Sequence, residues 1–527
     1  MPTTQTTKNA QRLTLIAMIL ASGIVFLDST VVNVALPHID RDLDMGLSGL
    51  QWIVDGYILT LAAFLILGGS IGDQYGRKKA MLAGIVAFGI TSVACGLAPG
   101  SIWLILARLL QGIGGAFVVP GSLAIITATF TDPEERGKAI GTWAGWSGIT
   151  SLIGPFLGGW LVDNLSWRFV FLINVPVIAA VLVLMRYVPE SLDEGVARHL
   201  DWAGATLGVI GLGGTVYGLI EGPATGWTGW LVLTSLAVGI IAIILFIVVE
   251  LRGKHPMMPL ALFRSRNFSA VNVVTLVVYF ALYGGGFFFP LYVQNIMGQS
   301  ALVSGVVFLP GSIMMLILSP RVGKLAGRFG ARLFMTIGPL IYAAGMLGYL
   351  FLQPDSNPWL LILPVAAITG LGLSLTVAPL TGTVMSSVPA HNSGVASAIN
   401  NVVSRIAALL AIAGLGIFVS QVFLNSLADL SRNLPPDQAR QLQKVAEASN
   451  GSGNSQGLSP DLAAVNAAAY TTAFHWVIVI CASLAFLGAL ISLIFIQNTH
   501  RNQEEPATAN TKNSQEIAHA DPRRRTV

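Results

Sequence analysis

The chain has 527 residues, of which 54% are hydrophobic and only 10% are charged, and its mean hydropathy is +0.72. This balance excludes a water-soluble globular protein of this size. Apolar stretches of about 20 residues, each long enough to cross a bilayer as a helix, recur along the chain and predict an all-α polytopic membrane protein. The first stretch is too long for a cleaved signal peptide. Cys95 and Cys481 both fall inside apolar stretches, so we expect no disulfide framework, no metal site and no cofactor.

Fourteen spans are predicted in chain order, an even number that places both termini on one side of the membrane. They begin near residues 13, 50, 80, 101, 138, 168, 201, 228, 268, 301, 330, 358, 394 and 470. With cytoplasmic termini, 22 Lys and Arg residues lie inside and 5 lie outside, while Arg108 and Arg405 lie within spans. Because cytoplasmic loops carry the excess of basic residues, this asymmetry predicts that both termini are cytoplasmic.

An internal repeat divides the chain into two halves. The segment "GSIGDQYGRKKAML" at 69–82 matches "GKLAGRFGARLFMT" at 323–336, so Gly69 and Gly76 correspond to Gly323 and Gly330. Spans 1 to 6 then correspond to spans 9 to 14, and spans 7 and 8 are an insert. Two related six-helix bundles around a midplane cavity form the architecture of alternating-access transporters.

These boundaries predict five regions along the chain. They are a cytoplasmic tail at 1–12, a first bundle at 13–190, two inserted linker helices at 201–251, a second bundle at 268–497 and a cytoplasmic tail at 498–527. Both tails are expected to be disordered. An extracytoplasmic loop at 425–469 carries "EASNGSGNSQGLSP", which predicts a flexible linker, beside a possible amphipathic helix in "PPDQARQLQKVAEA".

Three ionisable residues lie inside the spans of the first half. Asp28 in "VFLDSTVVNVALP" lies eight residues before Leu36, the expected outer end of span 1, at a depth of about 12 Å. Asp55 in "QWIVDGY" and Arg108 in "ARLLQG" lie about five and six residues into spans 2 and 4, which both enter the membrane from that outer side. An ionised side chain at a span centre costs at least about 2.5 to 3.5 kcal/mol, so it is retained where it is paired, hydrated or used. Asp28 is therefore either a carboxylate for which proton and substrate compete or half of a permanent ion pair with Arg108. Asp55 either shares that function or faces interfacial water near a helix start.

The loop after span 2, "GDQYGRKK", combines a tight turn with charges of both signs. Its basic residues fit a positive-inside anchor, which leaves Asp73 unexplained. The second copy has Gly327 in place of this aspartate, so only the first copy is expected to form a charged contact.

Span 5 contains the glycine-rich segment "WSGITSLIGPFLGGWL". Gly154, Gly158 and Gly159 leave a flat face for a neighbouring helix, and Pro155 removes a backbone donor and bends the span. Tight helix packing alone would explain this pattern, and a pivot between helices would use the same features.

The second half has one deep charge, Arg405 in "INNVVSRIAALL", and no membrane-embedded Asp or Glu. Arg405 either binds an anionic group or caps neighbouring carbonyls. The aromatic segment "VVYFALYGGGFFFPLYVQ" either packs helices or offers apolar and cation–π contacts to a flat ligand. Glu221, near the outer end of span 7, is expected to be a surface charge. The residues expected to line a substrate cavity are Asp28, Asn33, Tyr279, Tyr283, Phe287, Asn401 and Arg405.

Over residues 13 to 500 the chain resembles the major facilitator superfamily, in its fourteen-span drug/proton antiporter branch of the EmrB/QacA type. The motifs that carry the resemblance are "LDSTVVNVALP", "GDQYGRKK", "RLLQGIGGA" and "GPFLGGW". The resemblance implies a major facilitator fold of two pseudo-symmetric six-helix bundles plus two inserted helices. It further implies three groups of functional residues: Asp28, Arg108 and Asp55 for proton coupling; Asp73, Arg77, Gly69 and Gly76 for a conformational latch; and Gly154, Pro155, Gly158 and Gly159 for an antiporter hinge.

The expected function is secondary active transport, because the chain lacks the phosphate loop of an ATP-driven pump and the HExxH and GxSxG motifs of an enzyme. We expect a monomer of the cytoplasmic membrane that exports lipophilic, cationic drugs in exchange for protons. Its partners would be the drug, protons and the lipid bilayer, with no nucleic acid. The alternative cargo is an endogenous anionic or zwitterionic amphipath held by Arg405, and proton-coupled uptake shares the same fold.

Overall fold

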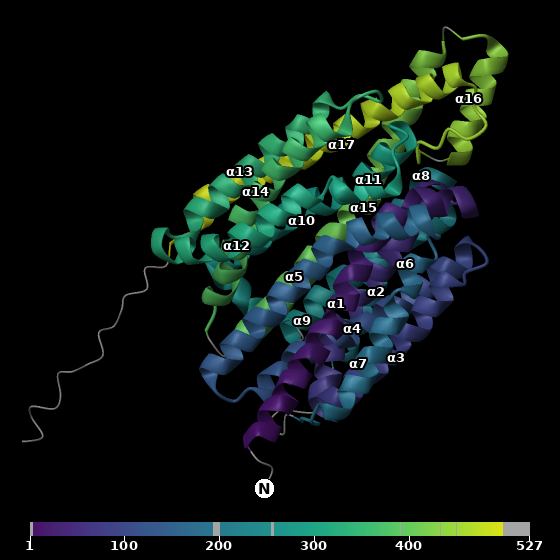
Figure 1. Cartoon of the computed structure of the whole chain (residues 1–527). Coiled ribbons are helices and arrows are strands. Elements are labelled where there is room, and N and C mark those ends of the chain that lie inside the picture. Colours follow the sequence, from purple (N-terminus) through teal and green to yellow (C-terminus); the bar gives the residue numbers. More distant parts are fainter. Residues whose placement is uncertain are drawn as a thin grey trace, which may run out of the picture.

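The computed structural model describes residues 4–192, 201–253, 258–389, 392–432, 434–449 and 451–498, and this part of the chain is built from helices (Figure 1). The first half contains α1 (Thr4–Leu43), α2 (Gly46–Tyr75), α3 (Arg77–Gly96), α4 (Ser101–Thr129), α5 (Pro133–Asn164), α6 (Phe169–Leu172) and α7 (Asn174–Leu184). An inserted pair follows, α8 (Trp202–Thr225) and α9 (Trp230–Arg252). The second half contains α10 (Arg266–Leu291), α11 (Ala301–Val306), α12 (Leu309–Phe329), α13 (Ala331–Gly348), α14 (Pro358–Ser386), α15 (Ser393–Ser431), α16 (Pro436–Ser449) and α17 (Pro460–Phe495).

Within these described ranges, 13 helical segments are long and apolar enough to cross a membrane. The sequence predicted fourteen spans, and α5 is the helix that does not meet this measure. It has 32 residues, but its first turn is acidic and its remainder is rich in glycine, so its hydropathy is low for its length. The all-helical polytopic membrane architecture is therefore confirmed with 13 candidate spans.

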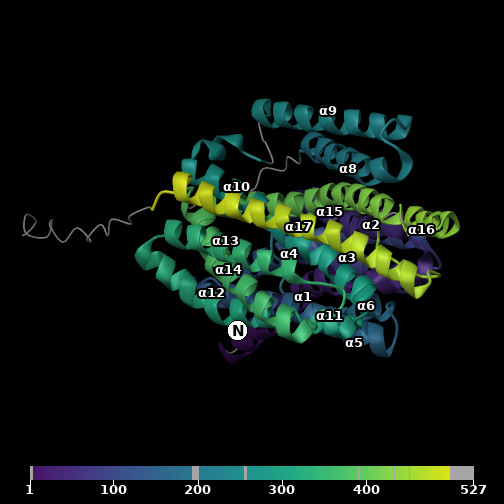
Figure 2. The same cartoon turned by 90° about the horizontal axis from the view of Figure 1, so that it is seen from above.

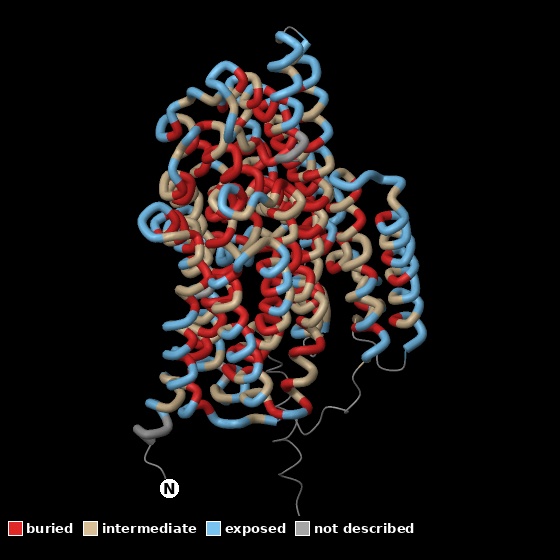
Figure 3. The backbone as a smooth tube through the Cα atoms, turned by 90° about the vertical axis from the view of Figure 1, so that its right-hand side faces the viewer, coloured by how far each residue is buried: buried red, intermediate tan, exposed pale blue. Residues whose placement is uncertain are grey.

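The two halves form two bundles that lie side by side (Figure 1). In the first bundle, α2 packs on α4, α1 on α5 and α3 on α4; in the second, α13 packs on α14 and α10 on α17. Buried positions gather inside the molecule and exposed positions cover its outer faces (Figure 3). Many of these exposed side chains are large and apolar, such as Ile240 and Ile244 of α9, as expected for helices that face lipid.

The internal repeat is visible as the same turn built twice. Gly76 between α2 and α3 has φ +115°, and Gly330 between α12 and α13 has φ +89°, a region that favours glycine. After each turn, a side chain accepts a hydrogen bond from the first backbone N–H groups of the next helix. This side chain comes from the segment just after the last helix of the same half. The backbone N of Lys78 donates to Glu190 Oε1 at 2.9 Å, and the backbone N of Arg332 donates to Asn498 Oδ1 at 3.1 Å. The second copy thus keeps the cap but replaces a carboxylate by a neutral amide.

The inserted pair covers the seam between the bundles. Helix α8 packs against α2 of the first bundle and α15 of the second, and α9 lies outermost (Figure 2). Trp52 Nε1 of α2 donates to Glu221 Oε1 of α8 at 2.7 Å, and the rings of Trp52 and Tyr217 are 5.9 Å apart. Glu221 is therefore not the plain surface charge predicted from its position, because it ties the insert to the first bundle.

The molecule has two ends, which we call the α16 end and the terminal end, the latter carrying residues 4 and 498. Close to the α16 end the two bundles are joined by a set of hydrogen bonds that we call the cross-bundle seal. Gln51 Nε2 donates to the carbonyl of Ile412 at 2.5 Å, Gln294 Nε2 to that of Val34 at 2.9 Å, and Ser452 Oγ to Asp40 Oδ2 at 2.9 Å. The carboxylate of Asp163 accepts from the backbone N of Ala301 at 3.1 Å and of Leu302 at 2.8 Å.

The loop at the α16 end corrects one prediction and confirms another. The amphipathic helix expected there is present as α16. The flexible linker expected after it is wrong for Gly451, Ser452 and Gly453, which are all buried. The two glycines have φ of +86° and +77°, so the backbone folds tightly enough to bring the Ser452 hydroxyl to Asp40. Asn450, a possible glycosylation acceptor, lies outside the described residues.

Helix α1 is longer at both ends than predicted. It begins at Thr4, so a disordered tail over 1–12 is wrong for the described residues, and it passes Leu36 and Pro37 to end at Leu43. A proline removes one backbone donor, yet α1 continues through Pro37. Beyond it, Arg41 Nε donates to the carbonyl of Pro37 at 3.2 Å, and Asp40 takes part in the seal. Asp28 therefore lies 15 residues, about 22 Å, from the end of α1, near the middle of the helix rather than in its outer part. The tail predicted beyond residue 498 lies outside the described residues.

Candidate functional site

Asp28 and Arg108 form a fully buried ion pair in the first bundle. Arg108 Nη1 lies 2.5 Å from Asp28 Oδ2, and the two side chains are 1% and 0% exposed. The other carboxylate oxygen accepts from Gln111 Nε2 and from Asn174 Nδ2, each at 3.1 Å. Helices α1, α4 and α7 thus converge on one carboxylate. Removing one partner of such a buried pair costs about 3–5 kcal/mol, because the other charge is left uncompensated.

Arg108 has further partners that do not depend on Asp28. Its Nε donates to the carbonyl of Ile53 at 2.9 Å, and its Nη1 donates to Gln111 Oε1 at 2.8 Å. Its guanidinium carbon lies 4.2 Å from the centre of the Tyr57 ring, a cation–π contact. The guanidinium therefore has three partners besides the carboxylate of Asp28.

Asp55 is also fully buried, on α2. Neither of its carboxylate oxygens has a hydrogen-bond partner among the described residues. It lies nine residues inside α2, so the alternative in which it faces interfacial water near a helix start is wrong. The first bundle thus holds two buried carboxyl groups with different surroundings. Asp28 accepts several hydrogen bonds, and Asp55 accepts none from the described residues.

The glycines of span 5 face two different helices. A Cβ atom at Gly158 would lie 2.8 Å from the carbonyl oxygen of Val31 in α1, within the same bundle, and Gly154 packs on Thr30 of the same helix. A Cβ atom at Gly159 would lie 2.6 Å from the Cα of Leu302 in α11, across the bundle interface. The motif therefore sets both the packing inside the first bundle and the contact between bundles, while α5 continues as a helix through Pro155.

The predicted latch residues lie at the terminal end. Arg77 Nε is 2.7 Å from Asp73 Oδ1, one helical turn away, and the backbone N of Arg77 donates to the carbonyl of Ser191 at 3.1 Å. Gly76 forms the turn between α2 and α3, and Gly69 lies in α2, where a Cβ would make an ordinary contact with Pro120. These contacts join the loop to the end of span 6 in its own bundle.

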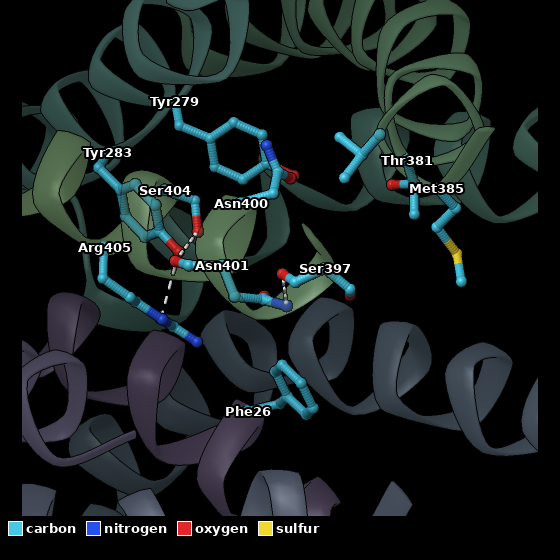
Figure 4. Close-up of a pocket in the computed structure, with 11 residues that line it drawn as sticks. Phe26, Tyr279, Tyr283, Thr381, Met385, Ser397, Asn400, Asn401, Ser404 and Arg405 are labelled. Carbon is cyan, nitrogen blue, oxygen red and sulfur yellow. Dashed lines mark hydrogen bonds between the residues drawn. The ribbon is translucent and has the colours of Figure 1, made fainter. Parts of the chain in front are cut away.

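A cavity of about 210 Å³ lies between the bundles (Figure 4). It is lined by Phe26 of α1, Tyr279 and Tyr283 of α10, Thr381, Val384 and Met385 of α14, and Ser397, Asn400, Asn401, Ser404 and Arg405 of α15. Thr381, Met385 and Asn401 are exposed. Because α14 ends and α15 begins at the terminal end, these exposed lining residues lie toward that end, and the cross-bundle seal lies toward the α16 end.

Arg405 carries the charge of this cavity. It is 9% exposed, its Nη1 donates to the Tyr283 hydroxyl at 3.3 Å, and it takes part in none of the ion pairs found among the described residues. Four of the residues predicted for a substrate cavity line this one: Tyr279, Tyr283, Asn401 and Arg405.

The other three predicted lining residues lie elsewhere. Asp28 is enclosed by its donors in the first bundle, so it does not face Arg405 across the cavity as predicted. Phe287 is fully buried against Phe288, with ring centres 4.9 Å apart, and the buried side-chain oxygen of Asn33 has no hydrogen-bond partner in the described part of the chain. The cavity lining therefore contains a cation and no acidic residue.

Sequence inspection did not single out three residues that hold the ion pair. Gln111 lies one turn after Arg108 on α4, Asn174 is an isolated amide in the apolar segment "FLINVPV", and Tyr57 follows Asp55 by two residues. An amide or a phenol inside an apolar span is costly unless it is hydrogen bonded, and this was the signal available for all three.

Two pseudo-symmetric bundles of membrane-length helices, sealed at one end around a cavity whose exposed lining residues lie toward the other, define a polytopic membrane transporter. Residues 18–412 match the family model of the Major Facilitator Superfamily, and the chain belongs to this superfamily. It is 39% identical over 407 residues to the multidrug resistance protein Stp of Mycobacterium tuberculosis, covering 77% of this chain and 75% of that protein. It is 36% identical over 442 residues to the tetracenomycin C resistance and export protein of Streptomyces glaucescens, covering 82% and 81%.

The fold is also found in a crystal structure of a bacterial homologue of the human lysosomal transporter Spinster, in an inward-facing and unoccupied conformation. The TM-score is 0.62 at 18% identity, over 93% of this chain and 99% of that one. The members of the superfamily matched here are transporters rather than enzymes, and the relatives in sequence are named for drug or antibiotic resistance.

Proposed function

We propose that this protein exports lipophilic, drug-like compounds across the cytoplasmic membrane in exchange for protons. The observation that carries the proposal is the buried pair of Asp28 and Arg108 at the centre of the first bundle. Apolar residues could pack this space equally well, so stability alone does not explain two charges there. Export is supported by the relatives, which are resistance and export proteins by name. The cell would gain resistance to antibiotics or other toxic compounds.

The proton would act on the two buried carboxyl groups. When Asp28 takes up a proton, its ion pair with Arg108 ends, while Arg108 keeps its contacts to Ile53, Gln111 and Tyr57. An ionised carboxylate without donors is costly in a buried site, so we infer that Asp55 carries a proton in this conformation and releases it in another. Protonation would thereby change the relative stability of two conformations of the whole protein.

The conformation described here would be the one that loads cargo from the cytoplasm. We infer that α5 also crosses the membrane, which gives fourteen spans and puts both termini on one side. The excess of Lys and Arg near that side supports a cytoplasmic terminal end. The glycine contact of α5 with α11 would act as the antiporter hinge, and the Asp73–Arg77 loop would latch the bundles once the terminal end closes. The protein would work as a monomer, because one chain holds both bundles and the cavity.

The charge of the cargo decides the energetics of the exchange. One proton against one monovalent cation is electroneutral, whereas a neutral drug moves one net charge, worth about 2.3 kcal/mol per 100 mV of membrane potential. A cationic drug was the first expectation from the sequence. The second candidate, export of an anionic or zwitterionic amphipath, is favoured by one observation: Arg405 has no ion-pair partner among the described residues, and the cavity lining contains no acid.

The test is dye movement in everted membrane vesicles under an imposed pH gradient, with the native chain and Asp28→Asn at equal expression. We expect the native protein to move a lipophilic probe and Asp28→Asn to bind it without gradient-driven movement. A native protein that moves neither cationic, neutral nor acidic probes under the gradient would refute proton-coupled export. Asn164→Asp, at an exposed position beyond the seal, serves as a matched control for a single exchange between carboxyl and amide.

A further inference from the structure

The cavity between the bundles contains a charge that no described residue of the protein neutralises. Arg405 is more than nine-tenths buried, and its one hydrogen bond to another described residue is the 3.3 Å contact to the Tyr283 hydroxyl. A buried guanidinium has five N–H donors and is stable only when these are satisfied and its charge is balanced. The lining supplies hydroxyl and amide groups but no carboxylate. The missing partner of Arg405 is therefore expected to come from a ligand.

The arrangement around Arg405 separates a polar corner from an apolar one. Figure 4 shows the guanidinium beside the Tyr283 hydroxyl, with Phe26 of the first bundle approaching from the opposite wall. The rings of Tyr279 and Tyr283 lie next to each other, with centres 6.2 Å apart. Met385 lines the exposed side of the same cavity and adds a flexible apolar surface. A ligand that fits this surface has an acidic head and a flat or flexible apolar body.

We propose that the cavity binds the acidic group of an amphipathic cargo, a carboxylate, phenolate or phosphate, on Arg405 and Tyr283, with its apolar body against Phe26, Tyr279 and Met385. This inference rests on the proposed transport function and names the class of its cargo. The volume of about 210 Å³ is smaller than the roughly 300–1,000 Å³ of pockets that enclose drug-sized ligands. The cavity therefore holds the head and the first part of the body, and the remainder extends past Met385 toward the terminal end.

The experiment compares three probes that share one fluorescent tail. The probes are 11-(dansylamino)undecanoic acid, its methyl ester, and a dansyl-alkyl trimethylammonium of equal length, each titrated into the purified full chain in neutral detergent without any gradient. We expect the acid to bind at least 10-fold more tightly than the ester or the cation. An equal affinity of the native protein for all three probes, or a preference for the cation, would overturn the proposal without any mutation.

Variants then assign the preference to Arg405. Arg405→Gln should abolish the difference between acid and ester, while Arg405→Lys, which keeps the charge, should retain part of it. Tyr283→Phe should weaken binding of the acid by a few fold, because it removes the hydroxyl that orients the guanidinium. Ser397→Ala, in the same cavity but uncharged, is the matched control and should affect all three probes alike. An undiminished preference for the acid in a folded Arg405→Gln protein would refute the assignment.

Two further arms identify the source of the acid and separate this proposal from the transport function. Displacement of the probe by phosphatidylglycerol but not by phosphatidylcholine assigns the site to a lipid headgroup, and displacement by soluble aromatic acids alone assigns it to a soluble cargo. Asp28→Asn should retain the preference for acid over ester while it loses gradient-driven transport. A native protein that prefers the acid but transports nothing under a gradient would refute proton-coupled export and leave the acid site standing.

Discussion

The contact between Gly159 and α11 predicts a substitution that changes the conformation of the protein without unfolding it. In Gly159→Ala the new Cβ would lie 2.6 Å from the Cα of Leu302, where an ordinary carbon contact is about 3.5–4.0 Å, so α11 must move away by about 1 Å. Overpacking of this kind costs about 1–3 kcal/mol. Because the contact joins the two bundles, this cost falls on the sealed conformation alone and lowers its population relative to others by about 5- to 150-fold.

Two neighbouring glycines serve as controls for this prediction. Gly158→Ala would place a Cβ 2.8 Å from the carbonyl of Val31 inside the first bundle, so it should lower thermal stability without opening the seal. Gly148→Ala meets nothing within 4 Å and should do neither.

The measurement is the distance between spin labels at the α16 end, on Leu165→Cys and Phe351→Cys, by pulsed electron resonance in detergent and in lipid discs. Both positions are exposed, and the native Cys95 and Cys481 are buried. Gly159→Ala should add a longer-distance population that is absent from the native protein and from Gly148→Ala. Identical distributions in all three, with Gly159→Ala fully folded, would refute the argument that this contact holds the bundles together.

Three further predictions follow from other contacts. Asp28→Asn should lower the thermal stability of the purified protein, and Asp28→Asn/Arg108→Gln should recover part of it, because half of a buried ion pair costs about 3–5 kcal/mol; an unchanged unfolding temperature in the single variant contradicts this. Asp163→Asn should lengthen the same spin-label distance, because it replaces a charged acceptor of two α11 amides by a neutral one; no change would show that the seal does not depend on this charge. Trp52→Phe should speed hydrogen exchange in α8, because it removes a hydrogen bond to a charged group worth about 1.5–3 kcal/mol, that of Glu221; unaltered exchange would mean that helix packing alone holds the insert.

The sequence predicted the features that depend on local pattern. Hydropathy predicted the helices, because a chain that crosses lipid must form its backbone hydrogen bonds within each helix. The repeated sequence pattern predicted the duplication. The two turns at Gly76 and Gly330 both have positive φ, a backbone conformation that residues other than glycine rarely adopt. A pairing of Asp28 with Arg108 was one of two alternatives, because a buried charge is costly unless it is paired, hydrated or used, and the structure shows the two side chains in contact.

Features that depend on contacts between distant segments were missed or misjudged. The burial of Ser452 required knowing that residues 412 positions apart meet at Asp40, and a stretch of Gly, Ser and Asn carries no such signal. Asp28 was predicted to line the cavity because the sequence gave its depth in the span but not the direction of its side chain. In the structure its carboxylate faces the interior of the first bundle, where it accepts from the amides of Gln111 and Asn174. A one-dimensional pattern gives the position of a residue along a helix, whereas the neighbours around it depend on the packing of other helices.

The enclosure of Asp28 changes how proton and cargo can be coupled, and the sign of one pH effect distinguishes the two possibilities. The ring of Tyr57 lies 4.2 Å from the Arg108 guanidinium carbon. If coupling were purely electrostatic, a proton on Asp28 would leave Arg108 uncompensated and strengthen the binding of an acidic cargo near Arg405, and cargo would favour the proton in return. Proton and cargo would then move together, which is cotransport.

Exchange requires the opposite sign, because the protonated protein must favour a conformation in which the cavity is closed to the cytoplasm. We therefore expect a dansyl-alkyl sulfonate of equal length, which stays ionised between pH 6 and pH 8, to bind the purified protein more weakly at pH 6 than at pH 8. Asp28→Asn, which cannot take up this proton, should lose the difference in binding between the two pH values. Tighter binding at pH 6 that disappears in Asp28→Asn would contradict exchange, since it would show that this carboxyl group and Arg405 take up proton and anion in the same conformation.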